Sequence, residues 1–183
     1  CCQNLKKVEI PKNSNLQTIE TGAFSNSKIE EIYIPSKVSI IGECSFYYCH
    51  NLLKVVIPTN SSLQTIESHA FYRSSIIEIF IPSNVTKICE NAFYECRNLR
   101  KVEIPANSNL QIIEPRAFYS TNITKIFIPS KVSKICESAF FDCKNLTNVE
   151  FAQNSNLQTI EKNVFSITNI NEILIPSKVS KIC

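Results

Sequence analysis

The sequence predicts a solenoid, an α/β fold that is mostly β, with about eight stacked units. Two observations predict it: a period that alternates between 24 and 23 residues, and a short apolar-polar alternation that ends at a proline in nearly every unit. The aliphatic residue that opens each unit falls at Leu5, Ile29, Leu52, Ile76, Leu99, Ile123, Leu146 and Ile170. Because the period runs through the whole chain, we expect residues 1–183 to form a single array with no second domain.

Each unit is expected to begin with a short strand. In LRKVEIP (99–105), Val102 and Ile104 share one face and Lys101 and Glu103 the other, which is the alternation of a β-strand. Pro105 has no N–H to donate, so it ends the ladder. One unit cannot bury its own apolar face, and neighbouring strands are therefore expected to stack as a parallel sheet about 4.8 Å apart.

An Ala-Phe phrase follows the proline in most units, after a return segment. The phenylalanines are Phe24, Phe46, Phe71, Phe93, Phe118, Phe140 and Phe165. We expect this phrase to form a tight turn or a brief helix before the next unit begins.

The composition excludes several classes of function. The net charge of +3 is too weak to indicate a nucleic-acid partner. No apolar run approaches the roughly 20 residues that a membrane-spanning helix needs, so no direct membrane span is expected in this segment. With two glycines, two histidines and Asp142 as the one aspartate, the chain lacks the material for a phosphate loop, a His-centred triad or a multi-His metal site. We therefore expect no enzyme activity, no cofactor and no metal.

One set of cysteines is expected to form a structural ladder inside the wall of the solenoid. The slot three residues after each phenylalanine, with its counterpart in the first unit, holds Cys2, Ser27, Cys49, Ser74, Cys96, Thr121, Cys143 and Thr168. Every occupant is small, which indicates a tight interior slot. The cysteines Cys2, Cys49, Cys96 and Cys143 are two strands apart, about 9.6 Å, which is beyond the reach of a disulfide.

Cys89 and Cys136 occupy a different slot. Glutamate fills the same position in other units, so we expect these two thiols to be partly exposed and the more reactive ones. Their six-residue spacing from Cys96 and Cys143 leaves a disulfide or a zinc site open as alternatives. Reduced thiols packed in the wall are the favoured interpretation, because the spacing is longer than usual for zinc and no histidine accompanies it.

The outward face of the strands carries a candidate binding strip. The central outward slot holds Glu9, Tyr33, Val56, Phe80, Glu103, Phe127, Glu150 and Leu174. Tyr33, Phe80, Phe127 and Leu174 thus form an apolar series on alternate strands, with Glu103 and Glu150 between the later ones. A row of exposed aromatic residues on the concave sheet suggests a surface for a partner. The alternative is ordinary cross-strand packing of β-favouring side chains.

A basic stripe is expected on the return segments. It consists of Lys87, Lys131, Lys134, Lys178 and Lys181. Such a stripe either meets an anionic surface, such as a sulfated glycan or membrane phosphates, or is a solvated face that keeps the array soluble. The second interpretation is favoured, since no aromatic residues are interleaved with the lysines.

The stretch LQTIESHAFYRSSIIEIFIPSNVTKICENAFYEC (63–96) resembles the BspA-type leucine-rich repeat, whose unit combines Ala-Phe, Cys and Ile-Pro phrases in this order. The resemblance covers the entire chain. It implies a non-catalytic, adhesin-like recognition module that binds a protein or glycan partner at the cell surface or outside the cell. The sequons at Asn60, Asn84, Asn122 and Asn145 add little, because chance predicts about as many.

An intracellular structural scaffold is the alternative function, with a cytoplasmic or cytoskeletal location. Nine cysteines in ladder-like positions suit a reducing compartment equally well. Neither end has the polar capping segment that solenoids need, so we expect a fragment of a longer array. Open ends of this kind favour end-to-end or lateral packing within a larger assembly.

Overall fold

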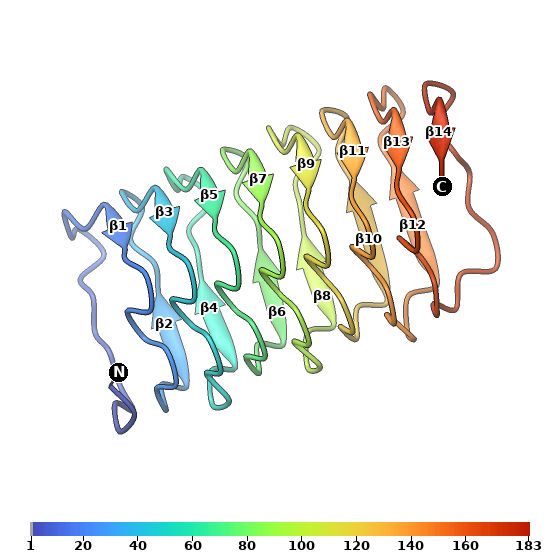
Figure 1. Ribbon diagram of the computed structural model, residues 1–183. Coiled ribbons are helices and arrows are strands. Elements are labelled where there is room, and N and C mark those ends of the chain that lie inside the picture. Colours follow the sequence, from blue (N-terminus) through green and yellow to red (C-terminus); the bar gives the residue numbers. More distant parts are fainter. Residues whose placement is uncertain (1) are drawn as a thin grey trace.

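The computed structural model describes residues 2–183, which coil into a solenoid with its turns side by side along one axis (Figure 1). One parallel sheet consists of eight two-residue strands on the return segments. These are β1 (Thr18–Ile19), β3 (Ile40–Ile41), β5 (Thr65–Ile66), β7 (Lys87–Ile88), β9 (Ile112–Ile113), β11 (Lys134–Ile135), β13 (Thr159–Ile160) and β14 (Lys181–Ile182). The predicted solenoid is confirmed, and its eight return strands delimit about seven complete coils.

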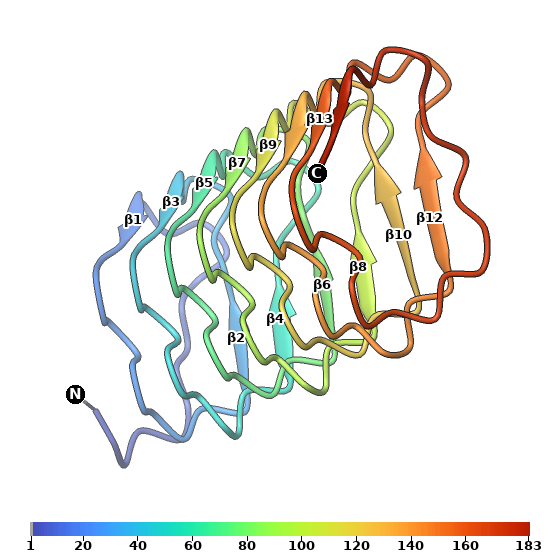
Figure 2. The same ribbon diagram turned by 45° about the vertical axis from the view of Figure 1, so that its right-hand side comes forward.

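A second set of parallel strands comes from the phrase that ends in Ile-Pro. Its members are β2 (Glu31–Tyr33), β4 (Lys54–Val56), β6 (Glu78–Phe80), β8 (Lys101–Glu103), β10 (Lys125–Ile128) and β12 (Asn148–Phe151). The register places Tyr33 beside Val56 and Phe80 beside Glu103, as the repeat alignment predicts. The two sets of strands lie on different sides of the coil (Figure 2).

The segment around Ala-Phe is a turn, and no residue from 2 to 183 is helical, so the fold is all-β. Backbone bonds between coils continue through this turn: Phe46 donates its N–H to the carbonyl of Ala70 at 2.7 Å, and Phe71 to that of Ala92 at 2.8 Å. A brief helix would direct these N–H groups along its own axis. The turn instead adds a third ladder of hydrogen bonds between coils.

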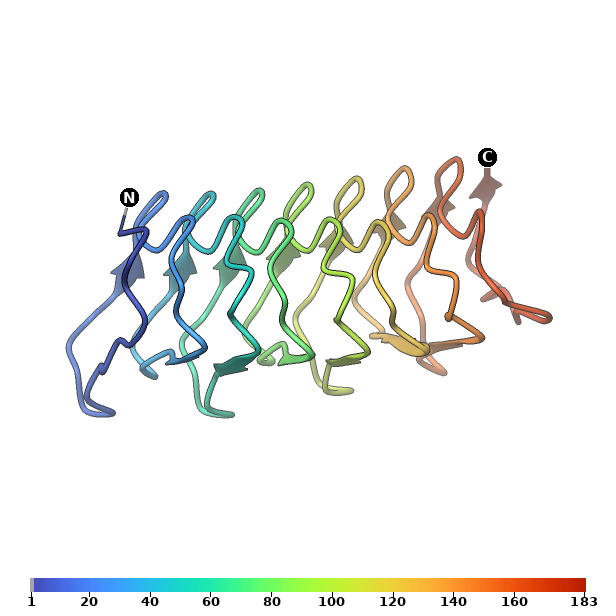
Figure 3. The same ribbon diagram turned by 90° about the horizontal axis from the view of Figure 1, so that it is seen from below.

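The phenylalanines of these turns form the centre of the core. Five of the seven rings are fully buried, and successive rings stack with centroids 5.0 to 5.7 Å apart. Isoleucine, leucine and valine side chains from both sheets complete the interior. Viewed from below, each coil repeats the path of its neighbour, which brings equivalent side chains into columns (Figure 3).

Candidate recognition surfaces

The predicted binding strip lies on the outer face of the longer strands. Tyr33, Phe80 and Phe127 are half-buried, whereas Val56 is 37% exposed and Leu174 is 87% exposed. Tyr33, Val56 and Phe80 stand on three consecutive strands and form one contiguous apolar group. Beyond β6 the apolar residues alternate with the exposed glutamates Glu103 and Glu150, so the strip is interrupted there.

A charged column runs beside this apolar group. Glu31, Lys54, Glu78 and Lys101 are neighbours on β2, β4, β6 and β8, so the sign of the charge alternates from strand to strand. Such exposed pairs contribute little to stability, because water and salt screen them. The column therefore borders the apolar group on one side with exposed charged groups, of which Lys101 is paired with Glu103 at 3.2 Å.

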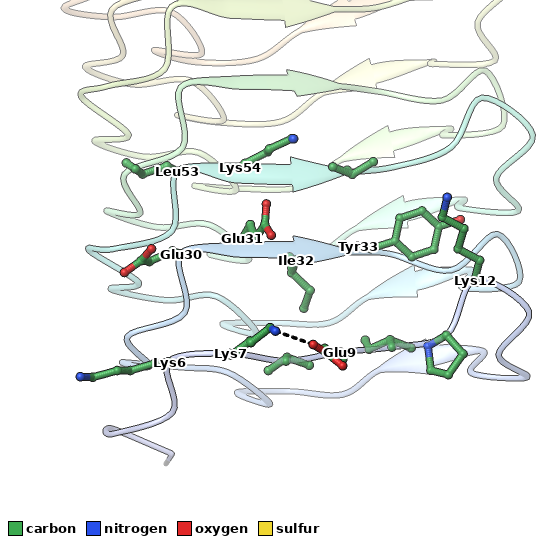
Figure 4. Close-up of a pocket in the computed structure, with 14 residues that line it drawn as sticks. Lys6, Lys7, Glu9, Lys12, Glu30, Glu31, Ile32, Tyr33, Leu53 and Lys54 are labelled. Carbon is green, nitrogen blue, oxygen red and sulfur yellow. Dashed lines mark ion pairs between the residues drawn. The ribbon is translucent and has the colours of Figure 1, made fainter.

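The N-terminal end of this face is hollowed (Figure 4). The hollow has a volume of about 1190 Å³ and extends from the chain at Lys6–Lys12 to β4. Tyr33 and Val56 are among the residues that line it, as are Lys7 and Glu9, which form an ion pair with Nζ and Oε1 2.5 Å apart. Its lining is thus apolar and of both charges, which suits a protein surface better than a small apolar ligand.

A second hollow of about 570 Å³ lies at the other end of the face. Phe127, Phe151 and Leu174 line it. Residues 172–175, which the repeat predicts as a further strand, are not paired in the sheet, and this leaves Leu174 exposed. The last part of the predicted strip therefore belongs to an open edge and not to a continuous sheet.

The predicted basic stripe carries less net positive charge than its lysines alone suggest. Lys87 Nζ lies 2.8 Å from a carboxylate oxygen of Glu114, and Lys134 Nζ lies 2.7 Å from one of Glu161. Each glutamate holds the pKa of its lysine above the usual range through a hydrogen bond. Lys131 and Lys178 donate instead to the side-chain oxygens of Asn109 and Asn156, and Lys181 is exposed. The stripe is a face of mixed charge.

The cysteines assigned to the wall are placed in one column with serine and threonine. Cys49, Cys96 and Cys143 are fully buried, and each thiol donates to a phenylalanine carbonyl, at 3.0, 2.9 and 3.1 Å respectively. The hydroxyls of Ser27, Ser74 and Thr121 lie 3.5, 3.5 and 3.2 Å from these sulfurs. Burial raises the pKa of Cys96 to about 12, and Cys2, at the N-terminal end, is exposed.

The expectation that Cys89 and Cys136 are partly exposed was wrong. Their exposed fractions are 7% and 4%, and burial raises the pKa of both thiols to about 11. The glutamates in the same slot of other units misled the prediction, because a glutamate can extend its carboxylate to a lysine outside while its backbone stays inside. Both cysteines are free, as are the other six of residues 2–183.

A tyrosine ladder on the turns is the surface feature that sequence reasoning missed. It consists of Tyr47, Tyr72, Tyr94, Tyr119 and Phe141, all half-buried. Their rings stack with centroid distances of 4.7 to 5.0 Å. Each follows a buried phenylalanine by one residue, so the signal was present in the sequence as a further column of the repeat.

Arg73 lies over the ring of Tyr72 in the tyrosine ladder, 5.6 Å from the ring centroid, and also belongs to a charged cluster. Its guanidinium donates to the hydroxyl of Tyr48 at 2.6 Å and lies 3.1 Å from a carboxylate oxygen of Glu95. The hydrogen bond with Glu95 holds the pKa of Arg73 above its usual range. The same carboxylate also binds Arg97, at 3.0 Å, so two guanidinium groups share one carboxylate and the cluster keeps a net positive charge.

A known family of repeat proteins matches the chain along its length, in agreement with the repeat, the two sheets and the stacked phenylalanines. Residues 1–100 and 64–183 match the family described as BspA type leucine rich repeat region (6 copies). The chain belongs to the BspA-type leucine-rich repeat family. No curated protein matches this BspA-type chain. Residues 2–183 contain no helix, and therefore no helix that is long and apolar enough to cross a membrane.

Solved bacterial structures share the fold of this BspA-type chain. A leucine-rich repeat protein from Bacteroides ovatus is 26% identical, with a TM-score of 0.69 over 91% of this chain and 49% of that one. A leucine-rich repeat protein from Treponema pallidum is 24% identical, with a TM-score of 0.70, over 82% of this chain and 70% of that one. A leucine-rich cell surface protein from Faecalibacterium prausnitzii is 23% identical, with a TM-score of 0.55, over 91% and 60%.

These lengths also show that the chain spans about half of the Bacteroides protein and three fifths of the Faecalibacterium protein. The proteins from Treponema pallidum and Faecalibacterium prausnitzii are 24% and 23% identical to this chain, and their similarity supports the fold alone.

Proposed function

We propose that this BspA-type leucine-rich repeat protein is a non-catalytic, adhesin-like recognition module that binds a protein partner on the outer face of its longer strands. The observation that carries the proposal is the contiguous apolar group of Tyr33, Val56 and Phe80 on β2, β4 and β6. It lies beside a column of alternating charges and next to the large hollow. An apolar centre with a polar rim is the usual arrangement of a protein interface.

The rest of the predicted strip extends this surface toward the C-terminal end. Phe127 and Leu174 supply further apolar contacts, and Glu150 supplies negative charge between them. Glu103, on the strand before Phe127, is paired with Lys101 at 3.2 Å. On this proposal Glu150 favours a partner with a basic group opposite it, since a like charge there would be disfavoured.

Display at the cell surface is part of the proposal. It is supported by the family. The leucine-rich cell surface protein of Faecalibacterium prausnitzii shares the fold. An intracellular scaffold is the second candidate. It is favoured by the eight free cysteines of residues 2–183, because unpaired thiols are usual in reducing compartments.

Biolayer interferometry tests the function. It measures the binding of the tag-free protein to immobilised fibronectin, fibrinogen, laminin and heparin. We expect binding to at least one of the three glycoproteins and little binding to heparin, because two of the five lysines of the basic stripe are paired with glutamates. Binding to none of the three by folded protein would contradict the adhesin-like function and favour the scaffold.

Two double variants then test the face. Phe80→Ser with Phe127→Ser should weaken binding at least tenfold and leave the circular dichroism spectrum unchanged, because both side chains are only half-buried. The matched variant Tyr94→Ser with Tyr119→Ser alters the tyrosine ladder on another side of the coil. If this second variant loses binding and the first does not, the proposed face is wrong.

A further inference from the structure

Three chemically different metal-ligating groups meet on the turn side of the solenoid. A carboxylate oxygen of Glu43, the sulfur of Cys44 and one ring nitrogen of His69 all lie within 4.8 Å of one another. His69 follows Cys44 by 25 residues, but the two come from neighbouring coils. Cys44 and His69 both stand two residues before a buried phenylalanine, and the N–H of Cys44 donates to the carbonyl of Ser68 at 3.1 Å.

The Nδ1 atom of His69 and the thiol of Cys44 have no other partner among residues 2–183. The Nδ1 atom is also buried. The thiol of Cys44 is free, whereas the wall cysteines donate to backbone carbonyls. A buried ring nitrogen without a partner is costly, and a bound cation would remove that cost.

The second nitrogen of His69 lies beside Asn91, which occupies the same slot in the next coil. The amide nitrogen of Asn91 is 3.3 Å from Nε2 and donates to Glu90 Oε1 at 3.2 Å. With a metal ion on Nδ1, the ring proton sits on Nε2, and the Asn91 amide accepts it only after turning its oxygen inward and giving up the bond to Glu90. Such an outer partner fixes the orientation of a ligating imidazole.

We propose that Glu43, Cys44 and His69 bind a zinc ion that links two neighbouring coils. Sulfur, nitrogen and carboxylate oxygen together are the ligands that zinc takes in proteins, whereas calcium and magnesium prefer oxygen alone. Three protein ligands leave a fourth position, and the exposure of Glu43 opens it toward water or a donor group from a partner.

Equivalent positions in other coils carry a different arrangement. Glu90 lies 3.9 Å from the guanidinium of Arg116, and Glu137 lies 3.2 Å from Lys162 Nζ. In those coils a basic side chain faces the glutamate, and residues 90–91 and 137–138 offer no thiol. An ion pair between Glu43 and protonated His69 is therefore the alternative that the experiment must separate from a zinc site.

Titration of tag-free, reduced protein with zinc chloride by calorimetry tests the site, together with the absorption spectrum of the cobalt(II) form. We expect one zinc ion per chain and a sulfur-to-cobalt charge-transfer band. Cys44→Ser should remove that band, and His69→Asn should weaken zinc binding at least tenfold. Asparagine suits this position because the φ of His69 is +58°.

His50→Asn and Cys183→Ser are the matched controls, since both residues are exposed and outside the cluster. Both should bind zinc as the unmodified protein does. Equal zinc affinity in all four variants, or no binding by the unmodified protein at any pH up to the limit of its stability, would overturn the proposal. Zinc should also raise the melting temperature of the unmodified protein and not that of Cys44→Ser.

Discussion

At the scale of single residues, every non-glycine residue with positive φ among residues 2–183 stands two positions before or after a phenylalanine of the stacked core column. The left-handed region suits glycine and asparagine, and it is strained for most other residues. Tyr48, Arg73 and Glu95 nevertheless occupy it. The hydrogen bonds between coils hold the backbone there, for example from Arg73 N–H to the carbonyl of Tyr94 at 2.8 Å.

Ile167 tests this strain, because a β-branched residue at φ +58° is especially unfavourable. Its side chain is 55% exposed, so little packing is lost on replacement. Ile167→Asn should increase the free energy of unfolding by about 1 kcal/mol in urea denaturation. Ile77→Asn is the control, since Ile77 is 44% exposed without a positive φ, and it should give no gain. Equal gains in both variants would contradict the explanation.

At the scale of elements, the column of Cys, Ser and Thr alternates so that no two thiols occupy neighbouring coils. Thr121 separates Cys96 from Cys143, and its hydroxyl lies 3.2 Å from the sulfur of Cys143. Neighbouring strands are about 4.8 Å apart, within the Cα separation of a disulfide, whereas two strands exceed it. The alternation therefore keeps the wall thiols reduced by distance.

Thr121→Cys should consequently form a disulfide with Cys143 when the protein is treated with diamide. The cross-linked peptide is detected by mass spectrometry of a non-reduced digest. In the unmodified protein, Cys96 and Cys143 should remain unlinked under the same treatment. A Cys96–Cys143 disulfide in unmodified, folded protein would show that the coils slip past one another or open.

At the scale of the whole molecule, the solenoid is a linear stack in which each coil packs against its neighbours. Stability in such a stack is approximately the sum of unit and interface contributions. The two-unit period preserves the alternation of the cysteine column. Removal of a whole period should therefore preserve both the register and the order of side chains in every column.

Deletion of residues 76–122 tests this, because it removes 47 residues and joins Ser75 to Ile123, the equivalent of Ile76. The shortened protein should keep its β circular dichroism spectrum and unfold at a lower urea concentration, having lost two coils of the stack. Deletion of residues 76–115 is the control, since 40 residues are not a multiple of the repeat, and it should prevent folding. Similar folding of both proteins would contradict a strict register.

The sequence by itself determined the period, the strands that end in Ile-Pro, their register and the family. These follow from residue spacing, because apolar alternation and proline act within one unit. The tertiary structure alone decided three further features. These are the burial of Cys89, the formation of a turn and not a helix at Ala-Phe, and the stacking of the tyrosine ladder. The same holds for the meeting of Cys44 with His69, residues 25 positions apart. These features depend on how each coil closes and on the direction of side chains at positive φ, and hydrogen bonds between coils fix both.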